Sequence, residues 1–363
     1  MDMNAAVQLR TTTPATPRPA PQEQSTGPRG IRLQREITAA GDLLDERGHL
    51  QRAGWSRGAR QFYQQERVQV RRQRLKEWEH TTVLTPDYAI SLTLTHLGVI
   101  GAAHVEVTRL SDGEAASGMD IFVARRGVLP PSPYVGKVFE KHTRRVQFDI
   151  GPESRSVRFS FGKRLSGHIE LSAPGPYDGL SVATPFDDPG FFFYEYKVPD
   201  QRATGWIDVG GDLHTLPDGE TQAIMDWGRG AWPKRSRWLW GWGAGRCGGG
   251  HVSLNLGGGF GDMRAATENA IVVDGVLHKL GEVSWKYDPM RRDEPWRFED
   301  DAGRLSLHFE PGCHHEVRTW LGIWSARLDK VFGHFSGTAV LDDGTRLQLD
   351  DIPGFAEEMS QRW

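Results

Sequence analysis

Cysteine is scarce in this sequence, because Cys247 and Cys313 are the only two among its 363 residues. Two thiols exclude a framework of several disulfides and any zinc site built from four thiolates. No stretch approaches the roughly 18 consecutive apolar residues of a membrane-spanning helix, and the N-terminus lacks the apolar core of a secretory signal. The sequence therefore predicts a cytoplasmic protein without an integral membrane segment.

Charge of one sign is not in excess, since 44 Lys and Arg stand against 47 Asp and Glu, for a formal net charge of −3. A dedicated nucleic-acid binder carries a strongly basic footprint, so this balance predicts that nucleic acid is not a partner. The sequence also lacks G-x-S-x-G and G-x-x-x-x-G-K-[ST] motifs, which disfavours serine hydrolases of that type and phosphate-loop enzymes.

Two short patterns resemble cofactor or metal sites but have a simpler interpretation. Residues 243–248 match G-x-G-x-x-G, yet a dinucleotide site needs a helix at this point and an alternating strand pattern follows. His314 and His315 are adjacent, so on a strand they point to opposite faces and cannot both ligate one ion without a bulge. We therefore predict neither a cofactor nor a metal.

Glycine and tryptophan are abundant instead, with 43 Gly and 13 Trp. Disordered chains are poor in aromatic residues, so this combination predicts a turn-rich β protein packed through aromatic side chains. From residue 80 onward, short runs of alternating apolar and polar residues are separated by turn residues, which is typical of antiparallel strands. The pattern predicts an all-β fold of two antiparallel barrel or sandwich domains.

The same patterns divide the chain into four predicted segments. Residues 1–30 are rich in Pro, Thr and Gln and predict a disordered tail. Residues 31–79 predict an extended arm and then a helix over 59–78, a stretch without Gly or Pro. We expect one β domain over residues 80–200 and a second over 201–363, the latter ending in a short helix at 353–363.

Residues 226–242 are the most informative stretch, with five Trp, four basic residues and one carboxylate. Trp238, Trp240 and Trp242 alternate and would share one face of a strand. Burying the arginines costs several kcal/mol unless they pair with nearby acids. The stretch predicts either a structural Trp/Arg stack that closes one end of a barrel, or an aromatic pocket for a large, mostly apolar ligand.

Asp226 and Glu268 are the candidate catalytic acids. A carboxyl group in a Trp-lined cavity has its pKa raised by desolvation, as a general acid at neutral pH requires. Glu268 is equally compatible with a surface turn or with an Arg partner. The candidate ligand-binding residues are the aromatic, cationic and polar side chains around this stretch, namely Glu195, Trp227, Arg229, Trp232, Arg235, Arg237, Trp238, Trp240, Trp242 and Asn255.

Several motifs taken together resemble domain-of-unknown-function family 2804. They are Asp226-Trp-Gly-Arg-Gly-Ala-Trp-Pro233, Leu254-Asn-Leu-Gly-Gly-Gly259, Thr267-Glu-Asn-Ala270, Val273-Asp-Gly-Val-Leu-His-Lys279 and Gly354-Phe-Ala-Glu-Glu358. The resemblance covers nearly everything after residue 31, with a departure at Glu195, where Asn is expected after the Tyr in many relatives. It implies two lipocalin-like barrels, as in carotenoid hydratases and tocopherol cyclases, an isoprenoid or polyketide ligand, and no cofactor.

Three functions therefore stay open. The first is a cofactor-independent cyclase, hydratase or isomerase acting on a hydrophobic small molecule, with Asp226 or Glu268 as the acid and the arginines holding a carboxylate or enolate. The second is a non-catalytic lipid or isoprenoid carrier. The third is a carbohydrate-active enzyme, which needs two carboxyl groups about 5–5.5 or 6.5–9.5 Å apart. The basic residues before position 80 also suggest peripheral contact with an anionic membrane surface.

Overall fold

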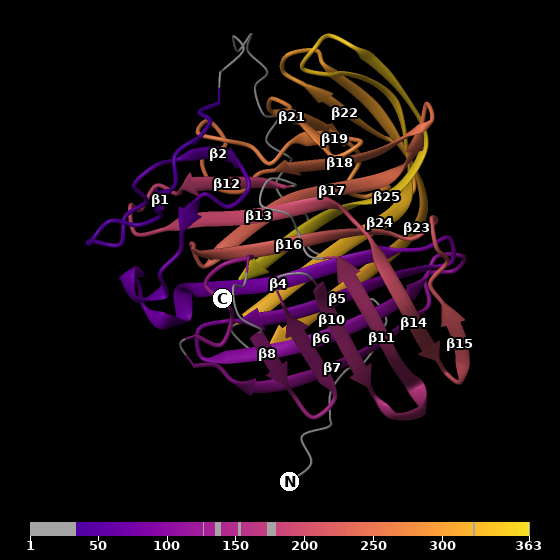
Figure 1. The fold of residues 1–363 in the computed structure, drawn as a ribbon, viewed down its shortest axis with the longest axis horizontal. Helices are drawn as coiled ribbons and strands as arrows, with labels where there is room; N and C mark the ends of the chain where they lie inside the picture. The colour runs from indigo at the N-terminus through magenta and orange to yellow at the C-terminus, as the bar shows by residue number, and fades with distance from the viewer. Residues whose placement is uncertain are drawn as a thin grey trace. The chain divides into compact units, whose positions relative to one another are not determined.

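The computed structural model describes residues 34–125, 127–134, 139–151, 154–172, 179–321 and 324–362. Strands account for nearly all of its regular structure (Figure 1). The described residues also hold three short 3-10 helices, η1 (Gln65–Arg67), η2 (Arg72–Arg74) and η3 (Gly162–Arg164). The predicted tail over residues 1–30 lies outside the described residues.

The first half of the chain builds two antiparallel sheets around one apolar core. The eight-stranded sheet runs β2 (Gly54–Arg57), β12 (Leu180–Pro185), β13 (Phe192–Gln201), β16 (Gln222–Ala231), β4 (Leu75–Leu84), β5 (Tyr88–His96), β6 (Ile100–Arg109), β7 (Ala115–Val123). The six-stranded sheet runs β15 (Asp212–Thr215), β14 (Ala203–Val209), β11 (Leu165–Ser172), β10 (Ser154–Ser160), β9 (Val146–Ile150), β8 (Phe139–His142). Alternate residues such as Leu92, Val105, Phe148 and Ile169 bury the facing surfaces of both sheets.

The second half builds one nine-stranded sheet that curls around its own core. Its order is β20 (Val276–Lys279), β19 (Ala270–Val273), β18 (Gly250–Gly258), β17 (Arg235–Cys247), β25 (Arg346–Arg362), β24 (Trp324–Val340), β23 (Leu305–Leu321), β22 (Trp296–Asp300), β21 (Val283–Lys286). Leu254 near one edge and Val283 near the other belong to the same buried cluster as Phe335 in the middle. A small parallel pair, β1 (Gly41–Asp42) and β3 (Gln61–Phe62), precedes the large sheets.

This arrangement confirms the predicted all-β fold of antiparallel, barrel-like units. The predicted boundary at 200/201 falls inside β13, before its last residue, and β14 begins at Ala203. Both strands belong to sheets of the first half, and the chain passes to the nine-stranded sheet only between β16 and β17. We propose a division of the two barrels near residues 232–234.

Both predicted helices are wrong. Residues 75–78 begin β4, which pairs with β16 and β5, and only η1 and η2 break the extended chain before it. Residues 353–362 belong to β25, which pairs with β17 on one side and β24 on the other. The good helix formers at these positions are outweighed by hydrogen bonding to two neighbouring strands and by burial of alternate side chains such as Phe355.

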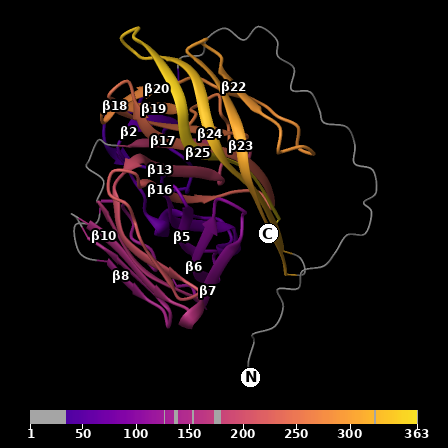
Figure 2. The ribbon, with the colours of Figure 1, turned by 90° about the vertical axis from the view of Figure 1, so that its right-hand side faces the viewer.

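Two sheets from different halves of the chain meet where β13 and β16 lie beside β17 (Figure 2). On the eight-stranded sheet, the register places Lys197, Asp226 and His80 in one row. On the nine-stranded sheet, Trp240 pairs with Glu357, and Glu357 with Lys330. The layer between these sheets is therefore rich in polar and charged side chains, unlike the two apolar cores.

Candidate functional site

A buried cluster of charged side chains lies where the eight-stranded sheet meets β17 and β18. The ammonium group of Lys197 on β13 is at its centre. Its carboxylate neighbours are Glu268 at 2.6 Å, Asp226 at 3.5 Å and Glu195 at 3.6 Å. The ammonium group also lies 3.9 Å from the ring centroid of Trp240. Three carboxyl groups thus share one lysine cation in a site that is largely closed to solvent.

Strand periodicity explains how the sheet supplies most of this cluster. Glu195 and Lys197 are two positions apart on β13, so their side chains share a face. Asp226 on β16 is the direct register partner of Lys197. The next residue on this face of β16 is Gly228, where an added Cβ would lie 2.2 Å from the Trp78 ring. The glycine keeps room for that indole ring beside the cluster.

Glu268 reaches the cluster from the loop between β18 and β19. The side-chain amide of Asn255 donates to the carboxylate of Glu268 at 3.1 Å and to its main-chain carbonyl at 2.8 Å. The indole N–H of Trp240 in turn donates to the side-chain oxygen of Asn255 at 2.8 Å. An added Cβ at Gly257 would lie 2.0 Å from the Glu268 carboxylate, so glycine is required there. Asn255 therefore orients Glu268.

Burial and mutual repulsion control protonation in the cluster. Burial raises the pKa of Glu195 well above its ordinary value, and the charge of Glu268 raises it further. Burial also raises the pKa of Asp226, although the Lys197 cation opposes this effect. Burial acts to lower the pKa of Lys197, but the carboxylates, Asp226 foremost, raise it above its ordinary value. The two shifts favour the charged form of Lys197 and the protonated form of Glu195.

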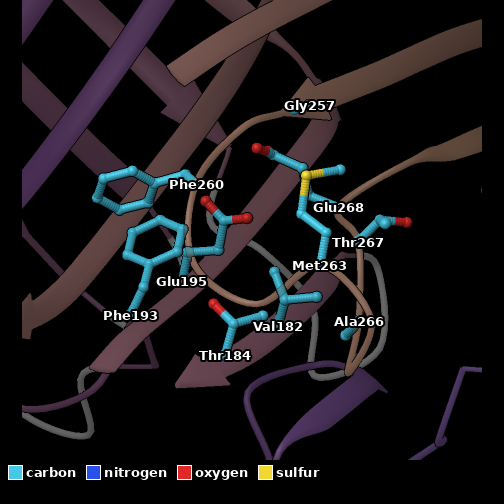
Figure 3. A pocket seen from close by; sticks show the side chains of 11 residues that line it. Val182, Thr184, Phe193, Glu195, Gly257, Phe260, Met263, Ala266, Thr267 and Glu268 are labelled. Atoms are coloured by element: carbon cyan, nitrogen blue, oxygen red, sulfur yellow. The ribbon is translucent and has the colours of Figure 1, made fainter. Parts of the chain in front are cut away.

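Glu195 and Glu268 line a small pocket of about 20 Å³, which is room for roughly one water molecule (Figure 3). Its other walls are mainly apolar, and the side chains of Phe193, Phe260 and Met263 lie around the Glu195 carboxyl group. Among the described residues, neither Oε1 of Glu195 nor the hydroxyl of Thr184 has a hydrogen-bond partner. Both buried polar atoms are therefore free to bind a water molecule or a ligand.

A second buried ion pair continues the polar layer away from this pocket. Lys330 lies 2.9 Å from Glu357 and 3.9 Å from the ring centroid of Phe355. Its other flank faces Trp240, whose ring centroid is 5.6 Å from the ammonium group. Trp240 is thus near two lysines, Lys197 and Lys330, one on each of the facing sheets.

His80 on β4 lies in the same layer. Its ring nitrogens contact the hydroxyls of Thr93 at 2.8 Å and Thr82 at 3.0 Å. Burial lowers the pKa of His80 well below its ordinary value, and the nearby cations of Lys330 and Lys197 lower it further. The imidazole is therefore neutral at pH 7.

Sequence reasoning missed Lys197, Lys330, Glu357 and His80 as members of one polar layer. A signal for part of it was present, because Glu195-Tyr-Lys197 puts two charged residues on one face of an otherwise apolar run. The pairing of that face with β16, which places Asp226 opposite Lys197, was not visible from local periodicity.

Two residues predicted to bind ligand lie on the opposite face of the eight-stranded sheet. Trp227 packs edge-on against Tyr63 and Tyr194. Arg229 donates to the main-chain carbonyls of residues 78, 228 and 130 and lies 3.5 Å from Glu79. Both side chains are fully buried in the first barrel.

The other predicted ligand-binding residues lie either in the polar layer between the eight-stranded and nine-stranded sheets or on the surface. Arg235 is exposed, and Arg237 pairs with Glu358 at 2.8 Å on a half-exposed surface. The three alternating Trp residues of β17 share one face, which is turned toward the eight-stranded sheet. Trp238 contacts Phe260 there, Trp240 contacts Lys197, and Trp242 donates its indole N–H to the carbonyl of Pro199 at 2.8 Å. Trp232 is buried beside Phe193 and Phe260.

A larger cavity of about 520 Å³ lies between the two halves of the chain. It is lined mainly by apolar side chains and glycine backbone, with Leu84, Ala244, Cys313 and Phe332 among its walls. Arg246 and Glu220, both exposed, stand at its edge. Its volume is typical of a small-molecule site, but none of the charged cluster around Lys197 lines it.

The cysteines carry no cross-link, since Cys247 and Cys313 are both free. Within the described ranges, no group of three or more His, Cys, Asp or Glu residues is arranged to hold a metal ion. None of the described helices is long and apolar enough to cross a membrane.

Comparison with known proteins gives a family and a fold. The model of the family described as "Domain of unknown function (DUF2804)" matches residues 34–363. No curated protein matches the sequence. Kievitone hydratase from Nectria haematococca superimposes with a TM-score of 0.50 at 12% identity, over 79% of this chain and 88% of that one. This similarity establishes a shared fold.

Two further solved structures are more distant. A putative AttH from Nitrosomonas europaea has a TM-score of 0.46 at 13% identity, covering 80% of this chain and 92% of its own. CghA with Sch210972 has a TM-score of 0.46 at 11% identity, covering 79% and 88%.

Proposed function

The chain belongs to the DUF2804 family, and we propose that it is a cofactor-independent hydratase or cyclase that protonates a carbon–carbon double bond of a hydrophobic small molecule. The observation that carries the proposal is the imbalance at Lys197, where three buried carboxyl groups share one cation. Charges buried in such excess are costly, so the cluster retains a proton at neutral pH. A retained proton next to an apolar wall is what acid catalysis on an alkene requires.

Glu195 is the best-placed proton donor. It is the most buried of the three carboxyl groups, and its free oxygen lines the pocket. Glu268 lies only 2.6 Å from Lys197 and accepts the Asn255 amide, so its carboxyl group is already engaged by two donors. Asp226 has the Lys197 ammonium at 3.5 Å on its own sheet. We therefore assign proton donation to Glu195 and the stabilisation of its partners' charges to Lys197.

The proposed step balances as follows. The Glu195 proton adds to one alkene carbon, and the neighbouring carbon becomes a carbocation. In hydration, a water molecule adds its oxygen to that carbon and gives its surplus proton to the Glu195 carboxylate, which restores the acid. In cyclisation, a second double bond of the ligand attacks the carbocation instead and forms the ring. The resulting cation then loses a proton to the Glu195 carboxylate, which restores the acid. The π face of Phe193 beside the pocket would stabilise the cation.

The shared fold adds support of a weaker kind. Kievitone hydratase, as its name says, adds water to an organic molecule, and it has this architecture. Fold alone does not assign function, so the carboxyl cluster carries more weight.

A carrier function is the second candidate, and the cavity of about 520 Å³ is the observation that favours it. A non-catalytic pocket needs apolar walls and volume but no buried acid, and this cavity has both. A carbohydrate-active enzyme is less well supported at the Lys197 cluster. Glu195 and Glu268 are close enough there to share a hydrogen bond, whereas glycoside hydrolysis uses carboxyl groups at least about 5 Å apart.

The test begins with the purified protein, its extraction with organic solvent and mass spectrometry of the extract. The recovered molecule, or a panel of isoprenoid and polyketide alkenes, is then incubated with enzyme in D₂O. The proposal expects a carbon-bound deuterium in the product, and its loss in Glu195→Gln. Glu220→Gln, at the edge of the larger cavity, is the matched control and should keep full turnover. Recovery of an unchanged ligand with both variants would favour the carrier.

A further inference from the structure

Phe260 occupies a box made of four other aromatic rings. The centroid distances from its ring are 4.8 Å to Phe193, 5.2 Å to Trp232, 5.3 Å to Trp238 and 5.3 Å to Phe186. All four contacts are edge-on or strongly inclined, which is a favourable geometry for aromatic pairs. The walls of the box therefore form a receptor for one flat, apolar ring.

The walls and the occupant differ in how firmly they are held. Phe193 and Trp238 come from the sheet strands β13 and β17. Phe260 comes from the loop after β18, within the run Gly257-Gly-Gly-Phe-Gly261. Gly259 and Gly261 on either side of it have φ of +78° and +72°, a conformation that favours glycine. Two walls of the box are thus held by sheet pairing, whereas Phe260 belongs to a loop that is tied down at Asp262, whose main-chain N–H donates to the carbonyl of Pro185 at 2.9 Å.

The box also presents an unused hydrogen-bond donor. Trp232 is 3% exposed, and its indole N–H has no partner among the described residues. A buried N–H without a partner costs free energy that an acceptor atom on a ligand would recover. A phenyl ring from Phe260 offers no such acceptor.

The box adjoins the acid cluster directly. Phe193 and Phe260 line the same pocket as the Glu195 and Glu268 carboxyl groups (Figure 3). That pocket, at about 20 Å³, is too small for an organic substrate while Phe260 is in place. Removal of the phenyl ring would join the box to the space beside Glu195.

We propose that Phe260 is a plug in the substrate site, and that residues 259–263 swing outward when a planar, apolar ring bearing an oxygen acceptor enters the aromatic box. This inference rests on the proposed function for what happens next, because the ring would hold a neighbouring double bond beside Glu195. The binding step itself requires no catalysis.

The first test measures binding of 2-naphthol, a planar aromatic alcohol, by quenching of tryptophan fluorescence and by calorimetry. If the open state makes up about a tenth of the wild-type protein, removal of the plug in Phe260→Ala strengthens the apparent affinity about tenfold. Phe298→Ala is the matched control, because it empties space in the core of the second barrel, away from the box. It should bind 2-naphthol no better than the wild type.

The second test uses the wild-type chain and needs no variant. Arg264 in the same loop is 71% exposed and is a trypsin site. Saturation with 2-naphthol should speed cleavage after Arg264 several-fold, since the loop leaves the box when the ring enters. Equal affinity of the wild type and Phe260→Ala, together with unchanged cleavage at Arg264, would overturn the plug.

The two proposals fail separately. Glu195→Gln is measured for turnover and Phe260→Ala for binding, because the first alters the acid and the second alters the plug. Tight binding of 2-naphthol by Phe260→Ala together with full turnover in Glu195→Gln would support the plug and contradict the role of Glu195 as the acid. Loss of turnover in Glu195→Gln without any gain of affinity in Phe260→Ala would support Glu195 as the acid and contradict the plug.

Discussion

The two faces of the eight-stranded sheet carry buried charges in different proportions. On the face toward the six-stranded sheet, Glu79 lies 2.6 Å from Arg155 and 3.5 Å from Arg229. Nearby, the Glu77 carboxylate accepts hydrogen bonds from Tyr63 at 2.6 Å and Gln65 at 2.8 Å. Here Glu79 faces two guanidinium groups and Glu77 has two hydrogen-bond donors, and the guanidinium groups find carbonyl oxygens as well.

On the opposite face of the same strands, three carboxyl groups compete for Lys197. The first network places two cations beside the buried Glu79 carboxylate, whereas in the second, burial and the charge of Glu268 raise the pKa of Glu195. The comparison teaches that burial alone does not mark a reactive acid. The ratio of carboxyl groups to cations and donors around it does.

The largest expected effect is on the balanced face. Glu79→Gln leaves Arg155 and Arg229 buried without a carboxylate, and we expect a loss of about 3–5 kcal/mol in the free energy of unfolding. Urea denaturation at pH 7 measures it. Glu299→Gln removes an exposed partner of Lys286 and should cost under about 1 kcal/mol. A loss as small as that of Glu299→Gln would contradict the structural role assigned to the buried ion pairs on the face toward the six-stranded sheet.

Removal of the cation tests the other face. Lys197→Met leaves three carboxyl groups together, and we expect a loss of about 3 kcal/mol at pH 8 but only about 1 kcal/mol at pH 5, where the carboxyl groups take up protons. The measurement is urea denaturation at both pH values. Equal losses at the two pH values would show that the cluster does not hold its charges as described.

The third prediction concerns the sign of the pH dependence. Because the pKa of Glu195 is raised in the folded chain, the folded state binds more protons than the unfolded state once the pH exceeds the ordinary Glu pKa. Its contribution to stability therefore falls by about 1.4 kcal/mol for each pH unit over which only the folded chain stays protonated. Glu195→Gln removes this decline, so its stability relative to the wild type should rise from pH 5 to pH 8. A flat difference would place the proton elsewhere.

The smallest expected effect compares two buried tryptophans, one on each side of the first barrel wall. Trp240 and Trp227 both lie about 4 Å from a cation, at 3.9 Å from Lys197 and 4.1 Å from Arg229. Of these two, the indole N–H of Trp240 donates to Asn255, whereas that of Trp227 has no hydrogen-bond partner among the described residues. Trp240→Phe should therefore cost about 1 kcal/mol more than Trp227→Phe. Thermal unfolding of both variants under the same conditions measures this difference in stability.

Local chemistry made much of the fold predictable. Alternation from residue 80 onward identified the strands, because a strand with one buried face must repeat every two residues. It failed at 59–78 and 353–363, where good helix formers lie in a sequence that pairs with distant strands. Helix propensity is worth tenths of a kcal/mol per residue, and pairing on both sides of β25 outweighs it.

The sequence by itself determined the all-β architecture, the shared face of Trp238, Trp240 and Trp242, and the supply of acids. Only the tertiary structure decided which acids meet. It brought Glu195, Asp226 and Glu268 around Lys197 and turned Arg229 to the other face. The physical reason is that protonation depends on the summed field of neighbours within a few ångströms. Those neighbours come from strands far apart in the chain, whose register no local pattern specifies.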